Sequence, residues 1–286
     1  MSDPRPIGLF DSGVGGLTVL REVRARSPRE STLYLGDNAR APYGSRPDPE
    51  VVMLSGECLD WLLEQHVKAV VVACSTSSSV ALDQLQRRST VPVLGIVEPA
   101  ATAAAAATRS GHVGVIATET TVRSGSFPRA IARERPDAEV HAVGTPALVP
   151  LVESGELDGA HVTDVVRMSL APFLQPATGA IDTLLLGCTH YPLLGAVIAN
   201  VMGSDVTVID PAAAIAAALA RLLETDRLEA PLDQEPRHLL RTTGDPMLFG
   251  RTAQRLFGGQ PPDVRNVALG AIDRASGPLA SVGASR

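Results

Sequence analysis

The chain has 286 residues, of which 45% are apolar and 20% charged, so it is long and apolar enough to form two domains with buried cores. Its net charge of −6 argues against a nucleic-acid-binding surface, which needs clustered Lys and Arg. Three cysteines are too few for a disulfide scaffold, the N-terminus MSDPRPIGLF lacks the apolar core of a signal peptide, and no apolar run is long enough to cross a membrane. We therefore expect a cytoplasmic protein that binds neither nucleic acid nor membranes.

The first predicted strand, residues 7–10, leads into a glycine-rich turn, DSGVGG, and then a helix over residues 17–26. Neither GxGxxG nor GxxxxGK[ST] is matched, which disfavours a nucleotide site. Asp11 and Ser12 lie in the turn. They either cap the helix or contribute a carboxylate and a hydroxyl to a small-molecule site.

A second strand, residues 32–35, ends in GDNARAPYGSR, residues 36–46. The run Pro42-Tyr43-Gly44 is incompatible with a regular helix or a central strand, so it predicts a loop. Open α/β sheets bind ligands at this edge, and backbone N–H groups in such loops bind carboxylates. A simple surface turn is equally compatible with these residues.

The next predicted helix, residues 49–66, contains Cys58, which has no polar cluster beside it and is interpreted as structural. A strand over residues 67–73 then leads to Cys74, Ser75 and Thr76, followed by a helix over 77–88. A strand over 91–97 and an Ala-rich helix over 100–108 complete this part of the chain.

A second series of elements begins with a strand over residues 113–117. Thr118, Thr120 and Thr121 follow it, in the place that Asp11 and Ser12 occupy after the first strand. The next elements are predicted at 126–133 (helix), 140–143 (strand), 147–156 (helix), 162–174 (helix) and 182–186 (strand). The 147–156 helix contains Glu153, and a lone Glu in that setting is typical of a solvated helix end.

The strand near residue 186 continues into LLLGCTHYPLL, residues 184–194. Gly187 permits a tight turn, and Pro192 suits the first turn of a helix. A thiol, a hydroxyl and an imidazole therefore lie at a predicted helix N-terminus, in Cys188, Thr189 and His190. Such a terminus lowers a thiol's pKa and binds carboxylates, whereas the alternative is an inert buried cysteine.

The remaining elements are a strand over 206–209, a helix over 212–224, a strand over 239–243, a helix to residue 257, an apolar strip over 264–269 and a polar tail, 276–286, expected to be disordered. Alternating strands and helices predict an α/β fold of parallel sheets covered by helices.

The sequence also indicates an internal duplication. VVVACSTSSSVAL, residues 70–82, follows the same plan as the stretch around Cys188, and Cys74 precedes Cys188 by 114 residues. The strand at 7–10 resembles the one at 113–116. We predict two pseudo-symmetric α/β domains, residues 1–97 plus 210–286 with Cys74 and residues 98–209 with Cys188, and an active site in the cleft between them.

Two thiols admit several functions. Two cysteines and one adjacent histidine, without CxxC or HxxxH spacing, disfavour a metal site. A disulfide switch is possible, and a thiol hydrolase using Cys188 and His190 leaves Cys74 without a role. Paired acid/base chemistry on the two faces of one carbon employs both thiols. It requires helix N-termini and hydroxyls to stabilise negative charge, with Asp11 and His190 each polarising one thiol, and no cofactor.

These residues resemble the glutamate racemases of the cofactor-independent aspartate/glutamate racemase superfamily. The matching segments are IGLFDSGVGGLTVL, YLGDNARAPYGSR, VVVACSTSSS, LLLGCTHYPLL and TTGDP at residues 242–246. The resemblance implies interconversion of L- and D-glutamate, which supplies D-glutamate for peptidoglycan, with glutamate as the small-molecule partner. It leaves a homodimer open.

The resemblance also implies roles for single residues. Cys74 would face the Cα proton of D-glutamate and Cys188 that of L-glutamate, with Asp11, Glu153 and His190 as supporting acid/base groups. The implied substrate contacts are Asp11, Ser12, Tyr43, Gly44, Ser75, Thr76, Thr118, Thr121, Thr189 and His190.

One position departs from the family pattern, because Ser75 stands where the family usually has Asn. Serine is shorter and has one donor, which leaves open a relative acting on aspartate. A cysteine-dependent hydrolase and a two-lobed binding protein for small acids are the further alternatives.

Overall fold

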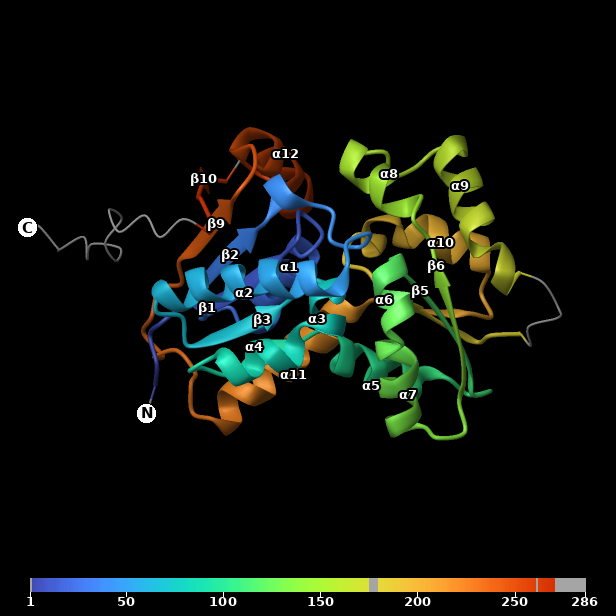
Figure 1. Ribbon diagram of the computed structural model, residues 1–286, viewed down its shortest axis with the longest axis horizontal. Coiled ribbons are helices and arrows are strands. Elements are labelled where there is room, and N and C mark those ends of the chain that lie inside the picture. Colours follow the sequence, from blue (N-terminus) through green and yellow to red (C-terminus); the bar gives the residue numbers. More distant parts are fainter. Residues whose placement is uncertain (1, 175–179, 261, 271–286) are drawn as a thin grey trace, which may run out of the picture.

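The computed structural model describes residues 2–174, 180–260 and 262–270, and the predicted polar tail at 276–286 lies outside them. Figure 1 shows two units side by side, each built on a parallel sheet. The larger sheet has six strands in the order β10-β9-β2-β1-β3-β4, all paired in parallel. Their bounds are Ile7–Asp11 (β1), Thr32–Gly36 (β2), Ala69–Val72 (β3), Val93–Gly95 (β4), His238–Thr242 (β9) and Val264–Asn266 (β10).

The smaller sheet has four parallel strands in the order β6-β5-β7-β8. These are His112–Ala117 (β5), Glu139–Gly144 (β6), Thr183–Leu186 (β7) and Thr207–Ile209 (β8). The order repeats that of β2-β1-β3-β4 in the larger sheet, so β1 corresponds to β5 and β3 to β7. The repeated order agrees with the duplication inferred from the sequence. The domain boundaries at residues 97/98 and 209/210 stay predictions.

Helices connect the strands and cover the sheets. In the first part of the chain they are α1 (Leu17–Arg26), α2 (Asp48–Glu64), α3 (Ser75–Val80), α4 (Leu82–Arg88) and α5 (Val97–Ala107). The later ones are α6 (Glu119–Ser124), α7 (Ser126–Glu134), α8 (Leu148–Ser154), α9 (Ala160–Leu170), α10 (Gly195–Met202), α11 (Pro211–Thr225) and α12 (Pro246–Phe257). No described helix is both long and apolar enough to span a bilayer.

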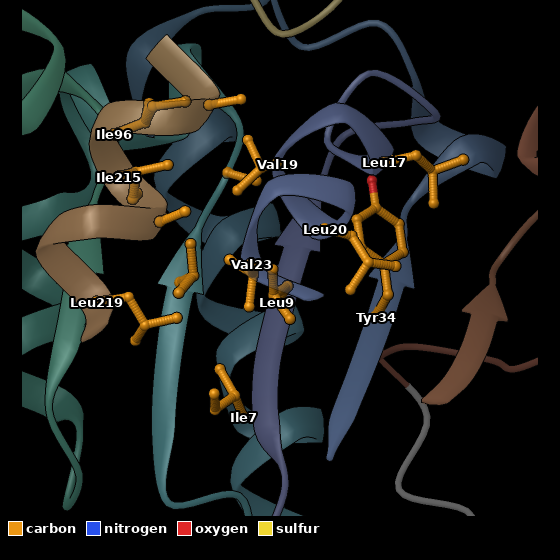
Figure 2. Close-up of a cluster of buried hydrophobic side chains, with 14 of the residues drawn as sticks. Ile7, Leu9, Leu17, Val19, Leu20, Val23, Tyr34, Ile96, Ile215 and Leu219 are labelled. Atoms are coloured by element: carbon orange, nitrogen blue, oxygen red, sulfur yellow. The ribbon is translucent and has the colours of Figure 1, made fainter. Parts of the chain in front are cut away.

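The two faces of each sheet bury separate apolar clusters, as parallel sheets require. Successive residues of β1 point to opposite faces, so Ile7 and Leu9 pack with α1 and α11, whereas Phe10 packs with α2 and α4. Figure 2 shows the first of these clusters, with Tyr34 beside Leu17. In the smaller sheet, one face packs on α8, α9 and α10 and the other on α5 and α7.

The structure differs from the predicted elements at two places in the first unit. The helix predicted over 77–88 is two helices, α3 and α4, separated at Ala81. The strand predicted to reach residue 97 ends at Gly95, and α5 begins at Val97. Pro99 is accommodated there because the first N–H groups of a helix have no carbonyl partner within it.

A third difference concerns the stretch after Cys188. No α-helix begins directly behind this thiol; a short 3₁₀ helix, Tyr191–Leu194, comes first, and α10 starts at Gly195. Two 3₁₀-type bonds close this turn, one from Tyr191 N to the Cys188 carbonyl (3.1 Å) and one from Leu193 N to the His190 carbonyl (3.1 Å). Only Cys74 therefore stands directly at an α-helix N-terminus, as the residue that precedes α3.

Candidate active site

The predicted site residues follow the carboxyl ends of corresponding strands in the two sheets. Asp11 ends β1, and Thr118 follows β5, its counterpart. Cys74 comes two residues after β3, and Cys188 two residues after β7. Because parallel strands end at the same edge of a sheet, each unit presents one thiol and one polar turn at its carboxyl edge.

A chain of polar contacts joins the two thiols across the units. Cys74 Sγ lies 3.7 Å from Ser12 Oγ, and the neighbouring Asp11 accepts a hydrogen bond at Oδ2 from Thr189 Oγ1 (3.1 Å). Thr189 directly follows Cys188. Both thiols are free and nearly inaccessible to solvent, with exposed fractions of 4% and 5%. The two units therefore form one continuous polar site.

His190 connects Cys188 to a carboxylate. Its Nδ1 lies 3.6 Å from Cys188 Sγ, and its Nε2 lies 2.6 Å from Glu153 Oε1. Burial alone would lower the pKa of His190, but the hydrogen bonds with Cys188 and Glu153 raise it well above its usual value. The imidazolium form donates from both ring nitrogens, which suits this arrangement. The pattern around Glu153 is typical of a solvated helix end, yet its carboxylate is paired with His190.

Cys74 has a different set of neighbours. Asp11 is completely buried, and burial raises the pKa of its carboxyl group, while His190 and the hydrogen bond from Gly13 N oppose that rise. Burial and then the charge of Asp11 raise the pKa of the Cys74 thiol, and hydrogen bonds with Ser77 oppose them. Loss of solvation therefore outweighs the effect of the helix N-terminus that follows Cys74.

Three threonine hydroxyls form a second cluster beside the thiols. Thr76 Oγ1 lies 3.0 Å from Thr118 Oγ1, which donates to Thr121 Oγ1 (3.0 Å). Thr121 Oγ1 in turn lies 3.4 Å from Thr76 Oγ1, so the cluster closes into a ring spanning both units. Gly44 packs against it, because a β-carbon there would meet Thr118 Cβ at 2.6 Å. Its carbonyl accepts a hydrogen bond from Thr120 N (3.1 Å).

Tyr43 and Ser75 behave differently from the other predicted contacts. The Tyr43 hydroxyl donates to Asp37, whose other carboxylate oxygen accepts a hydrogen bond from Thr243 Oγ1 (2.7 Å). Asp37 is buried and directly follows β2. It was not predicted as a site residue, although a carboxylate at a strand end could have indicated one. Ser75 Oγ is buried and has no hydrogen-bond partner among the described residues.

A pocket of about 360 Å³ lies elsewhere, between α3 and α4 on one side and α5 and α7 on the other. Its walls include Asp83, Glu98 and Arg129, and it does not include either thiol. Among the described residues, no group of three or more His, Cys, Asp and Glu side chains is arranged to hold a metal ion.

The sequence profile of the Asp/Glu/hydantoin racemases matches residues 17–219 of this chain. The chain belongs to the Asp/Glu/hydantoin racemase family. Two relatives align with this chain over almost its whole length. A glutamate racemase of Geobacter metallireducens is 42% identical over 266 residues, covering 93% of this chain and 97% of its own. One of Corynebacterium diphtheriae is 43% identical over 262 residues, covering 92% and 96%.

Solved structures of the racemase family have the same fold. Glutamate racemase isoform RacE1 from Bacillus anthracis aligns with a TM-score of 0.88 and 39% identity, covering 92% of this chain and 97% of its own. Glutamate racemase from Francisella tularensis, solved in complex with D-glutamate, aligns with a TM-score of 0.85 and 31% identity, covering 93% and 98%. The agreement over nearly full length places both sheets of this racemase within the shared fold.

Proposed function

We propose that this protein is a glutamate racemase that interconverts L- and D-glutamate and supplies D-glutamate for peptidoglycan synthesis. The relatives that match it over almost their entire length are glutamate racemases. The observation that carries the proposal is the pair of buried free thiols, Cys74 and Cys188, at corresponding strand ends of two units joined by one polar network. Deprotonation on one face of a carbon and protonation on the other employ two acid/base groups, and we assign these roles to the two thiols.

The proposed reaction moves two protons. With D-glutamate, the thiolate of Cys74 removes the Cα proton and becomes a thiol, and the thiol of Cys188 then delivers its proton to the opposite face. The product is L-glutamate, and the two sulfurs have exchanged protonation states. The reverse reaction starts from Cys188 as thiolate. The step needs no cofactor, because one sulfur takes a proton and the other gives one, and proton exchange with solvent then restores the starting state.

The deprotonated carbon transfers negative charge to the adjacent carboxylate, which the site must stabilise. We assign this task to the hydroxyls of Ser75, Thr76, Thr118 and Thr121 and to the backbone of Gly44. The buried hydroxyl of Ser75, which has no hydrogen-bond partner among the described residues, supports the assignment, since such a donor is available to a ligand carboxylate. Ser12, Thr189 and the loop at Tyr43 complete the proposed set of contacts.

The polar neighbours of the two thiols differ in charge, which suits their proposed roles. Cys188 faces the imidazolium of His190, itself held by Glu153, whereas Cys74 is close to Asp11 and Ser12. A cation stabilises a thiolate, and an anion favours a thiol. We therefore propose that His190 and Glu153 serve the Cys188 half of the reaction, and Asp11 and Ser12 the Cys74 half.

Further proposals concern the setting of the enzyme. Three unpaired thiols fit a reducing compartment, so we place the protein in the cytoplasm. We also propose two domains, residues 1–97 plus 210–286 and residues 98–209, because the strands of each sheet fall within these limits. A homodimer is a further proposal, tested by sedimentation.

The function is tested by incubating the purified protein with L-glutamate in D₂O without added cofactor. Two-base racemisation predicts loss of ellipticity together with deuterium at Cα of the newly formed D-glutamate. A parallel incubation with L-aspartate tests whether Ser75 has changed the substrate. If neither amino acid racemises nor exchanges its Cα proton, the proposed function is wrong.

Cysteine variants separate the racemase from its rivals. Cys74→Ala and Cys188→Ala are each expected to abolish racemisation, whereas a hydrolase that relies on Cys188 and His190 would tolerate Cys74→Ala. Cys58→Ala is the matched control, because Cys58 is equally buried but lies on α2, in the apolar cluster that contains Leu59. A protein that binds glutamate tightly without exchanging its Cα proton would instead be a binding protein.

A further inference from the structure

We infer that the hydroxyl of Tyr34 is a positioning group for the Cys74 half of the reaction, acting through the peptide of Gly13. The inference rests on the proposed racemase function and concerns a residue that otherwise belongs to the apolar core. Tyr34 touches neither thiol, so its role is to hold the loop that carries Asp11 and Ser12.

Packing explains the ring of Tyr34 but not its hydroxyl. Tyr34 lies on β2, is completely buried, and packs among the side chains of Leu17 and Leu20, as Figure 2 shows. Its ring also meets Phe249, with the ring centroids 5.9 Å apart. Phenylalanine would fill this space equally well, and a buried hydroxyl must find an acceptor to offset its lost hydration.

The acceptor is the carbonyl of Gly13, to which Tyr34 donates at 2.9 Å. The N–H of the same residue donates to Asp11 Oδ1 at 2.8 Å. Both backbone polar groups of Gly13 are thus hydrogen-bonded, the carbonyl to Tyr34 and the N–H to Asp11, the predicted acid/base carboxylate. Ser12 lies directly between Asp11 and Gly13 in the chain, with its hydroxyl 3.7 Å from Cys74 Sγ.

The loop lies directly on the phenol. A β-carbon at Gly16 would be 2.7 Å from the Tyr34 hydroxyl and 2.6 Å from Asp11 Cβ. Such spacing leaves no room for a side chain or a water molecule between the loop and the phenol at this point. The hydroxyl therefore fixes the height of the loop above β2, and with it the place of Ser12 beside Cys74.

The phenol keeps its proton under all conditions in which the enzyme would work. Burial raises the pKa of Tyr34 well above its usual value, and the nearby Asp11 and Cys74 add to the rise whenever they are ionised. The hydroxyl is therefore a permanent donor to Gly13, not a titrating participant. Its removal should change geometry at Cys74 without adding a new ionisation to the pH profile.

Tyr34→Phe tests this role, with racemisation measured from both enantiomers. The enantiomers are equally stable, so the two kcat/KM values must fall together, and we expect a drop of about tenfold, equivalent to ~1.4 kcal/mol of transition-state stabilisation. The specific readout is the isotope effect with Cα-deuterated substrate. It should rise for D-glutamate, from which Cys74 takes the proton, and decline for L-glutamate, because protonation by Cys74 then limits the rate.

Phe249→Leu is the matched control, because it loosens the packing against the Tyr34 ring and keeps the hydroxyl. It should lower Tm while leaving the ratio of the two isotope effects at its wild-type value. If Tyr34→Phe folds and keeps kcat/KM within twofold, or changes both isotope effects alike, the inference is overturned. A wild-type protein that does not racemise glutamate would instead refute the proposed function.

Discussion

Gly15→Ala is the sharpest test of how the two units fit together at the site. A β-carbon at Gly15 would lie 2.5 Å from Thr189 Oγ1 and 2.7 Å from His190 Nδ1. Ordinary contacts begin at 3.4 Å, so the threonine hydroxyl must move by about 0.9 Å and the imidazole by about 0.7 Å. Neither shift is free, because Thr189 donates to Asp11 and His190 Nδ1 faces Cys188.

The size of this displacement sets the expected effect. A misplacement of about 1 Å in a catalytic group costs up to roughly 100-fold in rate. We therefore expect kcat/KM of Gly15→Ala to fall by about 10- to 100-fold in both directions, or ~1.4–2.7 kcal/mol. Because the change acts on the Cys188 side, the isotope effect should rise with Cα-deuterated L-glutamate. Racemisation is followed by circular dichroism and folding by thermal unfolding.

Gly195→Ala is the control for this experiment. Gly195 opens α10 in the same unit as His190, but a β-carbon there meets nothing within 4 Å. Alanine should therefore leave racemisation unchanged and stabilise the helix by about 0.4–1 kcal/mol. A folded Gly15→Ala protein with kcat/KM within threefold of wild type would show that the two units do not meet as tightly as the structure indicates.

Three further predictions concern charge. Glu153→Gln removes an anion beside His190, so the pKa of His190 should fall and the alkaline limb of the kcat/KM–pH profile should move to lower pH; an unmoved limb would contradict the role of the pair. Burial alone would raise the pKa of Asp182, but bonds from Thr108 and two backbone N–H groups hold it well below its usual range. Asp182→Asn should therefore lower Tm at pH 7, and a difference from wild type that does not shrink as the pH falls below about 4 would refute this. Burial lowers the pKa of His238 to about 4, so wild-type stability should decline as the pH falls from about 6.5 to 4, and His238→Gln should flatten that slope in thermal unfolding.

The buried parallel strands were predictable because each is a short apolar run closed by a glycine or a polar turn. The strand predicted at 7–10 is observed as Ile7–Asp11, and the strand predicted at 32–35 is observed as Thr32–Gly36. The break between α3 and α4 was not predictable, because neither glycine nor proline interrupts the stretch around Ala81. There Ser77 and Ser78 bond to Ser55 and to Val97 N, contacts that depend on the folded state.

The part of the candidate site that belongs to the internal repeat was predictable from the sequence. Matching positions of Cys74 and Cys188 marked both thiols, and the structure gives them corresponding places in the two sheets. The contact of Glu153 with His190 joins residues 37 positions apart, so local pattern alone favoured a solvated glutamate. Burial of Asp11 and Cys74, which raises the pKa of both groups, depends on parts of the chain that are distant in sequence and cannot be inferred from the local pattern.

The repeated strand order bears on how a symmetric scaffold can serve an asymmetric task. Two identical copies around a twofold axis would give both thiols the same neighbours, and any substitution would appear twice. In a single chain that contains both units, this constraint is absent. A substitution after β1 leaves the corresponding position after β5 unchanged. Asp11 stands where its counterpart is Ala117, and Cys188, unlike Cys74, is followed two residues later by histidine. In the proposed mechanism, two units of different sequence can therefore give each face of the reacting carbon its own electrostatic environment, although the two enantiomers are equal in energy.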